Sequence, residues 1–276
     1  MQNSVQPMVR DTDNMNKLNR RQFVGGSTVA AGSLAAGIAM PGIARAAEDA
    51  WGDLTGKFVY DGVAPERKKL VVDKDVECCG KFDIRDESLM VGDDGGLKNV
   101  YIYVRSKRVD ICPDLDKETE DKVLLDNRDC IFVPHCMSIW TSKQKYHIVN
   151  SDPVAQNVAF NPLLDKPANI VIPVDGDATW TFRRAQRVPV PIACNYHPWE
   201  SAYILPLDHP YVAITDENGS FTIPKLPVGE LEFQIWHERV GYLNTQDWPK
   251  GRMKTTIQAG TNDLGTIKLA PSVLEK

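Results

Sequence analysis

Residues 190–200 read Val-Pro-Ile-Ala-Cys-Asn-Tyr-His-Pro-Trp-Glu, and this short stretch decides how the fold and the chemistry of the chain are interpreted. It places the thiol of Cys194 three residues before the imidazole of His197, and the carboxylate of Glu200 three residues further on. A thiolate and an imidazole on one loop can hold a metal ion together. Cys-x-x-His alone is a weak signal, so a second segment must supply the rest of any site.

That second segment is residues 150–160, which read Asn-Ser-Asp-Pro-Val-Ala-Gln-Asn-Val-Ala-Phe. It resembles the cupredoxin segment Asn-x-Asp followed by Pro-His-Asn-Val-x-Phe, and residues 194–200 resemble the amicyanin-type ligand loop Cys-x-x-His-Pro-aromatic-Met. The chain is similar to the plastocyanin and amicyanin-like cupredoxins of larger secreted bacterial proteins. The resemblance implies a blue-copper site with one thiolate, two imidazoles and a weak axial ligand. It also implies that Asn157 hydrogen-bonds to the ligand loop.

Two positions depart from the family pattern. Gln156 stands where the family has its first copper histidine, and Glu200 stands where it has the axial methionine. An amide oxygen is a poorer donor to soft Cu(I) than imidazole, and a carboxylate favours Cu(II) or Zn(II). Three interpretations follow for the set Cys194, His197, Gln156 and Glu200: altered copper binding, binding of another metal such as zinc, or no metal.

The other histidines are weaker candidates. His147 could replace the missing imidazole only if its strand were placed differently, because strand alternation fixes the face to which it points. His135, His209 and His237 stand at strand ends or beside turns, where a hydrogen-bonded structural histidine is the commoner outcome. A metal site on His135 and its neighbour Cys136 is sterically awkward.

The N-terminus predicts export. Residues 19–24 read Asn-Arg-Arg-Gln-Phe-Val, a weakly apolar stretch rich in Gly and Ala follows at 25–40, and Ala-Arg-Ala at 44–46 fits a cleavage site. This order resembles a twin-arginine signal peptide, which we expect at 1–46. The protein is then periplasmic, and nothing later in the chain offers a membrane span.

Charge argues against two classes of partner. The leader carries five of the 32 basic and two of the 37 acidic side chains, which leaves 27 basic and 35 acidic side chains in the mature chain and a net charge of −8. An acidic surface disfavours nucleic acid and anionic lipid as partners. The oligomeric state is left open.

All six cysteines lie in the mature chain, where export permits disulfides. Three bridges would use them all, but a thiolate at Cys194 leaves an odd number for pairing. Cys78 and Cys79 are neighbours in the sequence and are poorly placed to bridge each other. We expect one of them to reach a distant partner, with Cys130 as the first choice.

Short alternating runs bounded by turn residues predict an all-β chain. The resemblance implies that its fold is a cupredoxin-like Greek-key β-sandwich with additional strands of a small β-sandwich. Residues 47–112 form an N-terminal β segment, with a strand at 54–60 and a hairpin of 88–91 and 97–104. A loop at 113–121 precedes a cupredoxin-like domain at 122–207, in which prolines 189 and 191 favour a sheet edge. Its strands are expected at 130–133, 145–149, 157–160, 168–173, 178–182 and 188–194.

Residues 208–276 predict a further β meander. The runs Thr-Asp-Glu-Asn-Gly-Ser-Phe at 215–221 and Leu-Pro-Val-Gly-Glu at 226–230 resemble a carboxypeptidase regulatory-like domain, although such motifs are common turn chemistry. The resemblance implies a small sandwich.

Two hypotheses about function follow. The first is a periplasmic cupredoxin-like protein that binds copper in a degenerate type 1 site and exchanges single electrons with a redox protein partner. The second is a non-catalytic binding or structural module of the cell envelope that has lost the metal. No nucleophile elbow, paired catalytic acids or zincin helix is present in the sequence, so no enzyme is expected.

Overall fold

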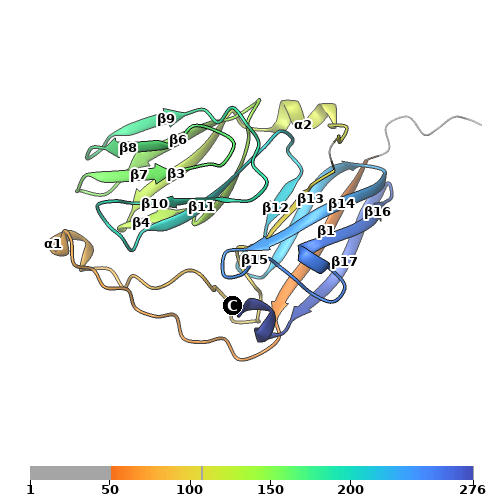
Figure 1. Ribbon diagram of the computed structural model, residues 1–276, viewed down its shortest axis with the longest axis horizontal. Coiled ribbons are helices and arrows are strands. Elements are labelled where there is room, and N and C mark those ends of the chain that lie inside the picture. Colours follow the sequence, from red (N-terminus) through yellow and green to blue (C-terminus); the bar gives the residue numbers. More distant parts are fainter. Residues whose placement is uncertain (1–50, 107, 276) are drawn as a thin grey trace, which may run out of the picture. The chain divides into compact units, whose positions relative to one another are not determined.

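Strands make up almost all of the regular structure in the computed structural model, which describes residues 51–106 and 108–275 (Figure 1). The all-β class predicted from the sequence is confirmed. The signal peptide predicted at 1–46 lies outside the described residues. Within the described part of the chain, no helix is both long enough and apolar enough to cross a membrane.

Residues from the two ends of the described chain build one sandwich. One of its sheets has the order β13-β1-β17, and the other has the order β12-β2-β14-β15 with β16 paired to β14. The strands are β1 (Trp51–Tyr60), β2 (Tyr101–Val104), β12 (Val212–Ile214), β13 (Ser220–Pro227), β14 (Gly229–His237), β15 (Gly241–Tyr242), β16 (Arg252–Ile257) and β17 (Gly260–Leu269), with 3-10 turns η1 (Pro249–Gly251) and η2 (Pro271–Leu274).

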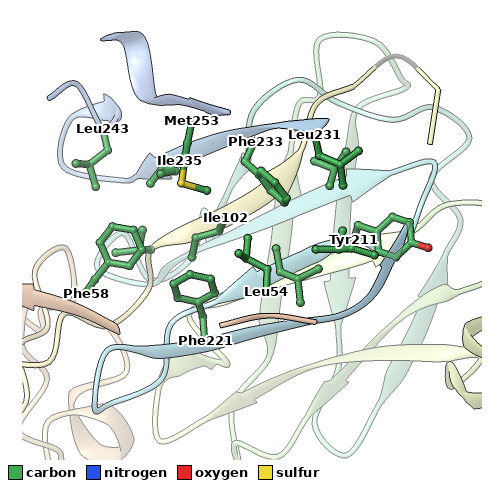
Figure 2. Packing of buried hydrophobic residues seen from close by; sticks show 14 of the residues in the cluster. Leu54, Phe58, Ile102, Tyr211, Phe221, Leu231, Phe233, Ile235, Leu243 and Met253 are labelled. Atoms are coloured by element: carbon green, nitrogen blue, oxygen red, sulfur yellow. The ribbon is translucent and has the colours of Figure 1, made fainter. Parts of the chain in front are cut away.

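Alternation along the strands explains this pairing. Leu54 and Phe58 of β1, and Phe221 of β13, turn inward and meet Ile102 and Phe233 of the opposite sheet in one core (Figure 2). The segments 47–112 and 208–276, which the sequence analysis treated separately, therefore share a single hydrophobic core. Local patterns predict strands, but they do not say which strands pair across a long insertion.

The insertion forms a second sandwich, which is consistent with the predicted cupredoxin-like fold. Its sheets have the orders β4-β3-β6-β9 and β5-β11-β10-β7-β8. The strands are β3 (Lys122–Arg128), β4 (Ile131–Val133), β5 (Cys136–Trp140), β6 (Lys145–Asn150), β7 (Gln156–Phe160), β8 (Ala168–Ile172), β9 (Asp177–Trp180), β10 (Val190–Ala193) and β11 (Ser201–Leu207).

The core of the second sandwich is rich in aromatic side chains. Tyr146 contacts Phe160 and Phe182, with ring centroids 6.1 and 6.0 Å apart, and all three are buried. Tyr146 and Ile148 face inward along β6, so the intervening His147 faces outward, where its Nδ1 lies 3.4 Å from Thr179 Oγ1.

The loop expected at 113–121 is partly helical. Helix α2 (Pro113–Glu118) begins with proline at its first position, where the missing N–H costs no hydrogen bond. Asp114 and Asp116 lie in its first turn, where the helix dipole favours negative charge. The polarity that predicted a loop belongs to a short surface helix.

The hairpin expected from 88–91 and 97–104 is shorter than predicted. Its turn exists, because Gly92 N–H donates to Gly96 O and Gly95 has a φ of +80°. Only Val91 and Leu97 then pair as an isolated bridge, and β2 begins at Tyr101. Asn99 has a φ of +67°, which interrupts the extended backbone between the turn and β2.

Pro191 lies in an interior strand of the sheet, so the sheet-edge prediction is wrong. Strand β10 lies between β11 and β7, but only Ile192 and Ala193 of β10 pair with β7. Pro191 therefore precedes the ladder with β7, where a missing N–H breaks no bond on that side.

Strand β2 contributes to two clusters, and this explains why all four of its residues are buried. Ile102 and Val104 belong to the core of the first sandwich, whereas Tyr101 and Tyr103 pack with Leu205 and other residues of the inserted segment. The Tyr101 hydroxyl donates to Tyr203 O at 2.9 Å and accepts from Met137 N–H at 3.0 Å. These backbone contacts satisfy a buried polar group.

The chain between β1 and β2 makes a long excursion that carries helix α1 (Val76–Cys79) (Figure 1). Its two arms pair through Leu70 N–H donating to Ile84 O and Asp86 N–H donating to Lys68 O. Cys79 forms a disulfide with Cys130, 51 residues away, so the predicted partner Cys130 is confirmed. The other four cysteines, all in the described chain, are not in disulfides.

His135 joins three separate segments of the chain. Its Nε2 lies 2.8 Å from Glu238 Oε1, after β14, and its Nδ1 lies 3.5 Å from Glu87 Oε2, on the excursion. Burial alone would lower the pKa of His135, but the two carboxylates outweigh it and raise the pKa to about 9. His135 is therefore a buried imidazolium that holds two carboxylates, and it is a structural histidine as predicted.

This arrangement predicts a loss of stability at mildly alkaline pH. Because the folded pKa is raised above the unfolded value of 6.5, the stabilisation is fully present below pH 6.5 and is lost as the pH rises through about 9. At roughly 1.4 kcal/mol per pKa unit, the free energy of unfolding should fall by an amount on the order of 3 kcal/mol. Denaturant unfolding from pH 6 to pH 9.5 measures it.

The His135→Gln variant is the control, because it removes the titrating group and should make this part of the pH profile less steep than in the wild type. An equal slope in the variant and the wild type would contradict the assignment.

Candidate metal centre

The loop between β10 and β11 gathers three of the four predicted ligands. Cys194 follows β10, and Glu200 immediately precedes β11. The loop folds back on itself, because Glu200 N–H donates to His197 O at 3.0 Å and His197 N–H donates to Cys194 Sγ at 3.3 Å. These local bonds turn all three side chains toward one point.

Strand β7 brings the fourth predicted ligand to the same point. It pairs with β10 in an antiparallel register that places Ala159 opposite Ala193, so its first residue, Gln156, lies beside the loop. Asn157 accepts a hydrogen bond from Asn195 N–H at 3.0 Å. The contact from Asn157 to the ligand loop, implied by the resemblance, is confirmed.

Four potential ligand atoms converge in the interior. His197 Nδ1 lies 2.8 Å from Gln156 Oε1, 3.1 Å from Glu200 Oε1 and 3.8 Å from Cys194 Sγ, and Cys194 Sγ lies 3.6 Å from Gln156 Oε1. Cys194, His197 and Glu200 each offer one ligand atom, and these three atoms lie within 4.8 Å of one another. No more than 3% of any of the four residues is exposed.

The orientation of Gln156 is set by a carboxylate behind it. Its Nε2 donates to Asp152 Oδ2 at 2.8 Å, which leaves Oε1 directed at His197 and Cys194. Asp152 in turn accepts the backbone N–H of Cys130, at 3.2 Å to each carboxylate oxygen. Gln156 therefore presents the one atom of its amide that can bind a cation.

A residue that the sequence analysis missed contacts the far side of His197. Asp75, immediately before α1, places Oδ2 at 2.8 Å from His197 Nε2. It lies 122 positions from His197 in the sequence, and no local motif marks it. The signal that could have found it is the disulfide expected between Cys130 and the adjacent pair 78–79, because such a bond brings the neighbours of that pair to the second sandwich.

Electrostatics at the centre are dominated by His197 and Glu200. Burial acts to lower the pKa of His197, but close contacts with Cys194, Glu200 and Asp75 raise it to about 11. Burial raises the pKa of Glu200, while His197 opposes that change. Without a metal, His197 therefore carries a proton on each nitrogen and balances the buried carboxylate.

The hydrogen bonding of the Glu200 carboxylate is nevertheless incomplete. Both of its carboxylate oxygens are buried, and neither has a hydrogen-bond partner among the residues that the structure describes, although Oε1 makes the ion-pair contact with His197. A buried carboxylate without hydrogen bonds is costly. Soft sulfur, borderline nitrogen and hard oxygen donors around one point suit copper or zinc. The residues present therefore fit a bound metal ion.

The remaining histidines lie away from this centre. His209 Nε2 donates to Val104 O at 3.0 Å, and burial lowers its pKa. His237 is fully buried, and its pKa is lowered to about 4 by that burial. His147 contacts Thr179, so it does not replace the missing imidazole, and His135 binds carboxylates while Cys136 contributes to the cluster with Tyr101.

Comparison with known proteins gives few similarities. No protein-family model matches the chain, and no curated protein matches it. Among solved structures, it is similar to amicyanin in a Cu(I) form, at 13% identity and a TM-score of 0.27, over 38% of this chain and 98% of amicyanin.

Two further structures are similar to the same degree. A purple cupredoxin from Nitrosopumilus maritimus is 14% identical with a TM-score of 0.26, over 32% of this chain and 100% of that one. A copper-containing nitrite reductase from Thermus scotoductus is 13% identical with a TM-score of 0.27, over 31% of this chain and 22% of the reductase. Scores this low carry no information about the metal centre, which depends on its own geometry.

The contacts around His197 predict an alkaline titration in the metal-free protein. NMR of the imidazole nitrogens should show both ring nitrogens protonated at pH 8, because three partners hold the pKa near 11. Glu200→Gln removes one negative charge and should lower that pKa. Glu238→Gln, which contacts His135 instead, should leave it unchanged. A wild-type His197 whose pKa lay near the ordinary histidine value of 6.5 would contradict this geometry.

Proposed function

We propose that the chain is a cupredoxin-like protein that binds copper through Cys194, His197, Gln156 and Glu200 and passes single electrons. The observation that carries the proposal is the convergence of four donor atoms, one of them from a buried carboxylate that has no hydrogen-bond partner in the described chain. Twin-arginine export would place it in the periplasm as a folded, loaded protein.

Charge balance supports this donor set. The thiolate of Cys194 and the carboxylate of Glu200 together carry two negative charges, whereas His197 and Gln156 bind as neutral groups. A divalent ion therefore makes the buried centre neutral, and a monovalent ion leaves it with one excess negative charge. Bound copper would supply the one-electron couple. Glu200 in place of methionine then favours the oxidised state.

Burial supports electron transfer over catalysis. All four donors are almost completely buried, so they leave no open position at which a substrate could reach them. An electron carrier needs only a short path to its surface. Tyr196, within the ligand loop, is 42% exposed and offers an aromatic contact for a redox protein partner. We therefore propose a carrier and not an enzyme.

A second candidate function has its own supporting observation. His197 is paired at both nitrogens, with Asp75 on one side and Gln156 and Glu200 on the other. This pairing balances the buried charges without a metal. It favours a non-catalytic module of the cell envelope that keeps the fold and holds no ion.

One experiment separates the two candidates. The mature protein is mixed with Cu(II), and the visible spectrum and bound metal are recorded. The carrier predicts one copper per chain and a thiolate-to-copper absorption band. Cys194→Ser should abolish the band, whereas Cys78→Ser, which removes a thiol outside the donor set, should keep it. Absence of both the band and stoichiometric metal in the wild type would leave only the metal-free module.

The charge of Glu200 predicts a change in reduction potential. Glu200→Gln removes a negative charge that stabilises Cu(II) over Cu(I), so the midpoint potential should rise by an amount on the order of 100 mV. Spectroelectrochemistry measures it. Glu77→Gln, an exposed carboxylate on α1, controls for the loss of net charge and should change the potential far less. A lower or unchanged potential in Glu200→Gln would contradict the role of this carboxylate.

A further inference from the structure

The excursion between β1 and β2 covers the edge of His197 that faces away from the other donors. Asp75 Oδ2 lies 2.8 Å from His197 Nε2, and the His197 side chain is fully buried even though the Asp75 side chain is half-exposed. The contact therefore joins a surface carboxylate on one segment to a proposed ligand on another.

A network centred on Cys130 holds this segment in place. The disulfide links Cys130 to Cys79, at the end of α1, four residues after Asp75. The backbone of Cys130 also reaches the donors, because its N–H donates to Asp152 and its carbonyl accepts Trp199 Nε1–H at 2.9 Å. The ring of Trp199 in turn packs on His197, with centroids 5.0 Å apart.

We propose that Asp75 is a positioning residue for the metal centre, and that the Cys79–Cys130 disulfide holds it there. The inference rests on the proposed function, since it concerns the affinity of the same centre. Asp75 accepts the Nε2–H of His197, so the nitrogen that gives up its proton to a metal ion is Nδ1, which faces Gln156, Glu200 and Cys194.

The disulfide matters because α1 is too short to hold Asp75 in position by itself. The helix has four residues, and Asp75 has no side-chain capping bond to it. The arms of the excursion pair with each other at Leu70 and Ile84, and the Cys79–Cys130 disulfide ties them covalently to the second sandwich. Without the disulfide, the Asp75 carboxylate would spend part of its time away from His197, and the orientation of the His197 imidazole would be less well defined.

The first test removes the carboxylate without straining the backbone. Asp75 has a φ of +44°, a region that glycine and asparagine adopt readily, so Asp75→Gly and Asp75→Asn keep the chain path. Loss of such a partner typically weakens metal binding by about 10- to 100-fold. We expect a loss in that range for Asp75→Gly and a smaller loss for Asp75→Asn, which can still accept the hydrogen bond. Competition titration with Cu(II) or Zn(II) measures it, with Glu77→Gln as the control at wild-type affinity.

A second readout reports the hydrogen bond directly. In the Zn(II) form, which is diamagnetic, NMR should show a slowly exchanging Nε2–H on His197. Asp75→Gly should make that proton exchange quickly, while Glu77→Gln should not. A purely structural role for Asp75 would change thermal stability and leave this signal and the metal affinity unchanged.

A double-mutant cycle tests the role of the disulfide. Cys79→Ser with Cys130→Ser should weaken metal binding several-fold in the wild-type background and by less than about twofold in the Asp75→Gly background. An equal loss in both backgrounds would show that the disulfide acts through other contacts of Cys130 and would overturn its proposed role.

The outcomes of these tests distinguish this inference from the proposed function on which it rests. Wild-type affinity in Asp75→Gly, in a protein that binds metal, overturns the positioning role and leaves the proposed function standing. A wild-type protein that binds neither Cu(II) nor Zn(II) overturns both. Thermal unfolding, together with mass spectrometry of the disulfide, verifies that each variant is folded.

Discussion

Pairing of β7 with β10 is the constraint on which the candidate centre depends. The register fixes Gln156 beside the loop that carries Cys194 and His197, and the hydrogen bond from Asn195 N–H to Asn157 fastens that loop to the strand. A shift of one residue would direct Gln156 to the other face of the sheet. The hydrophobic core of the second sandwich, with Phe160 and Ile192 paired across the two strands, resists that shift.

Charge then decides what this geometry can do. Glu200, His197 and Cys194 lie together where water does not reach them. Burying such a cluster costs free energy unless its charges balance. The protein has two ways to match them: a second proton on His197 or a cation among the donors. The incomplete hydrogen bonding of Glu200 favours the cation. In the proposed copper centre, the same balance would make Glu200, which replaces a neutral ligand of the family pattern, the residue that most alters the electron affinity of the metal.

The sequence predicted the parts of this account that depend on local pattern. The alternating runs predicted most of the strands, and the two motifs at 150–160 and 190–200 identified side chains that the structure brings together. The adjacent cysteines at 78–79 indicated a bridge to a distant partner, for which Cys130 was the first choice. Helix α2 was missed because its polar residues are equally typical of a loop. The joint core of β1 and β13 was missed because their pairing spans the whole second sandwich. Asp75 was missed for the same reason, since only the folded excursion brings it to His197.

X-ray absorption at the copper edge of the Cu(II)-loaded protein tests the central claim most directly. The account predicts a first coordination sphere of one sulfur, one imidazole nitrogen and two oxygens, which in the Cys194→Ser variant contains no sulfur. A sphere of nitrogen and oxygen alone in the wild type would show that copper binds elsewhere on the protein. That result would contradict the proposal that Cys194, His197, Gln156 and Glu200 form a metal centre.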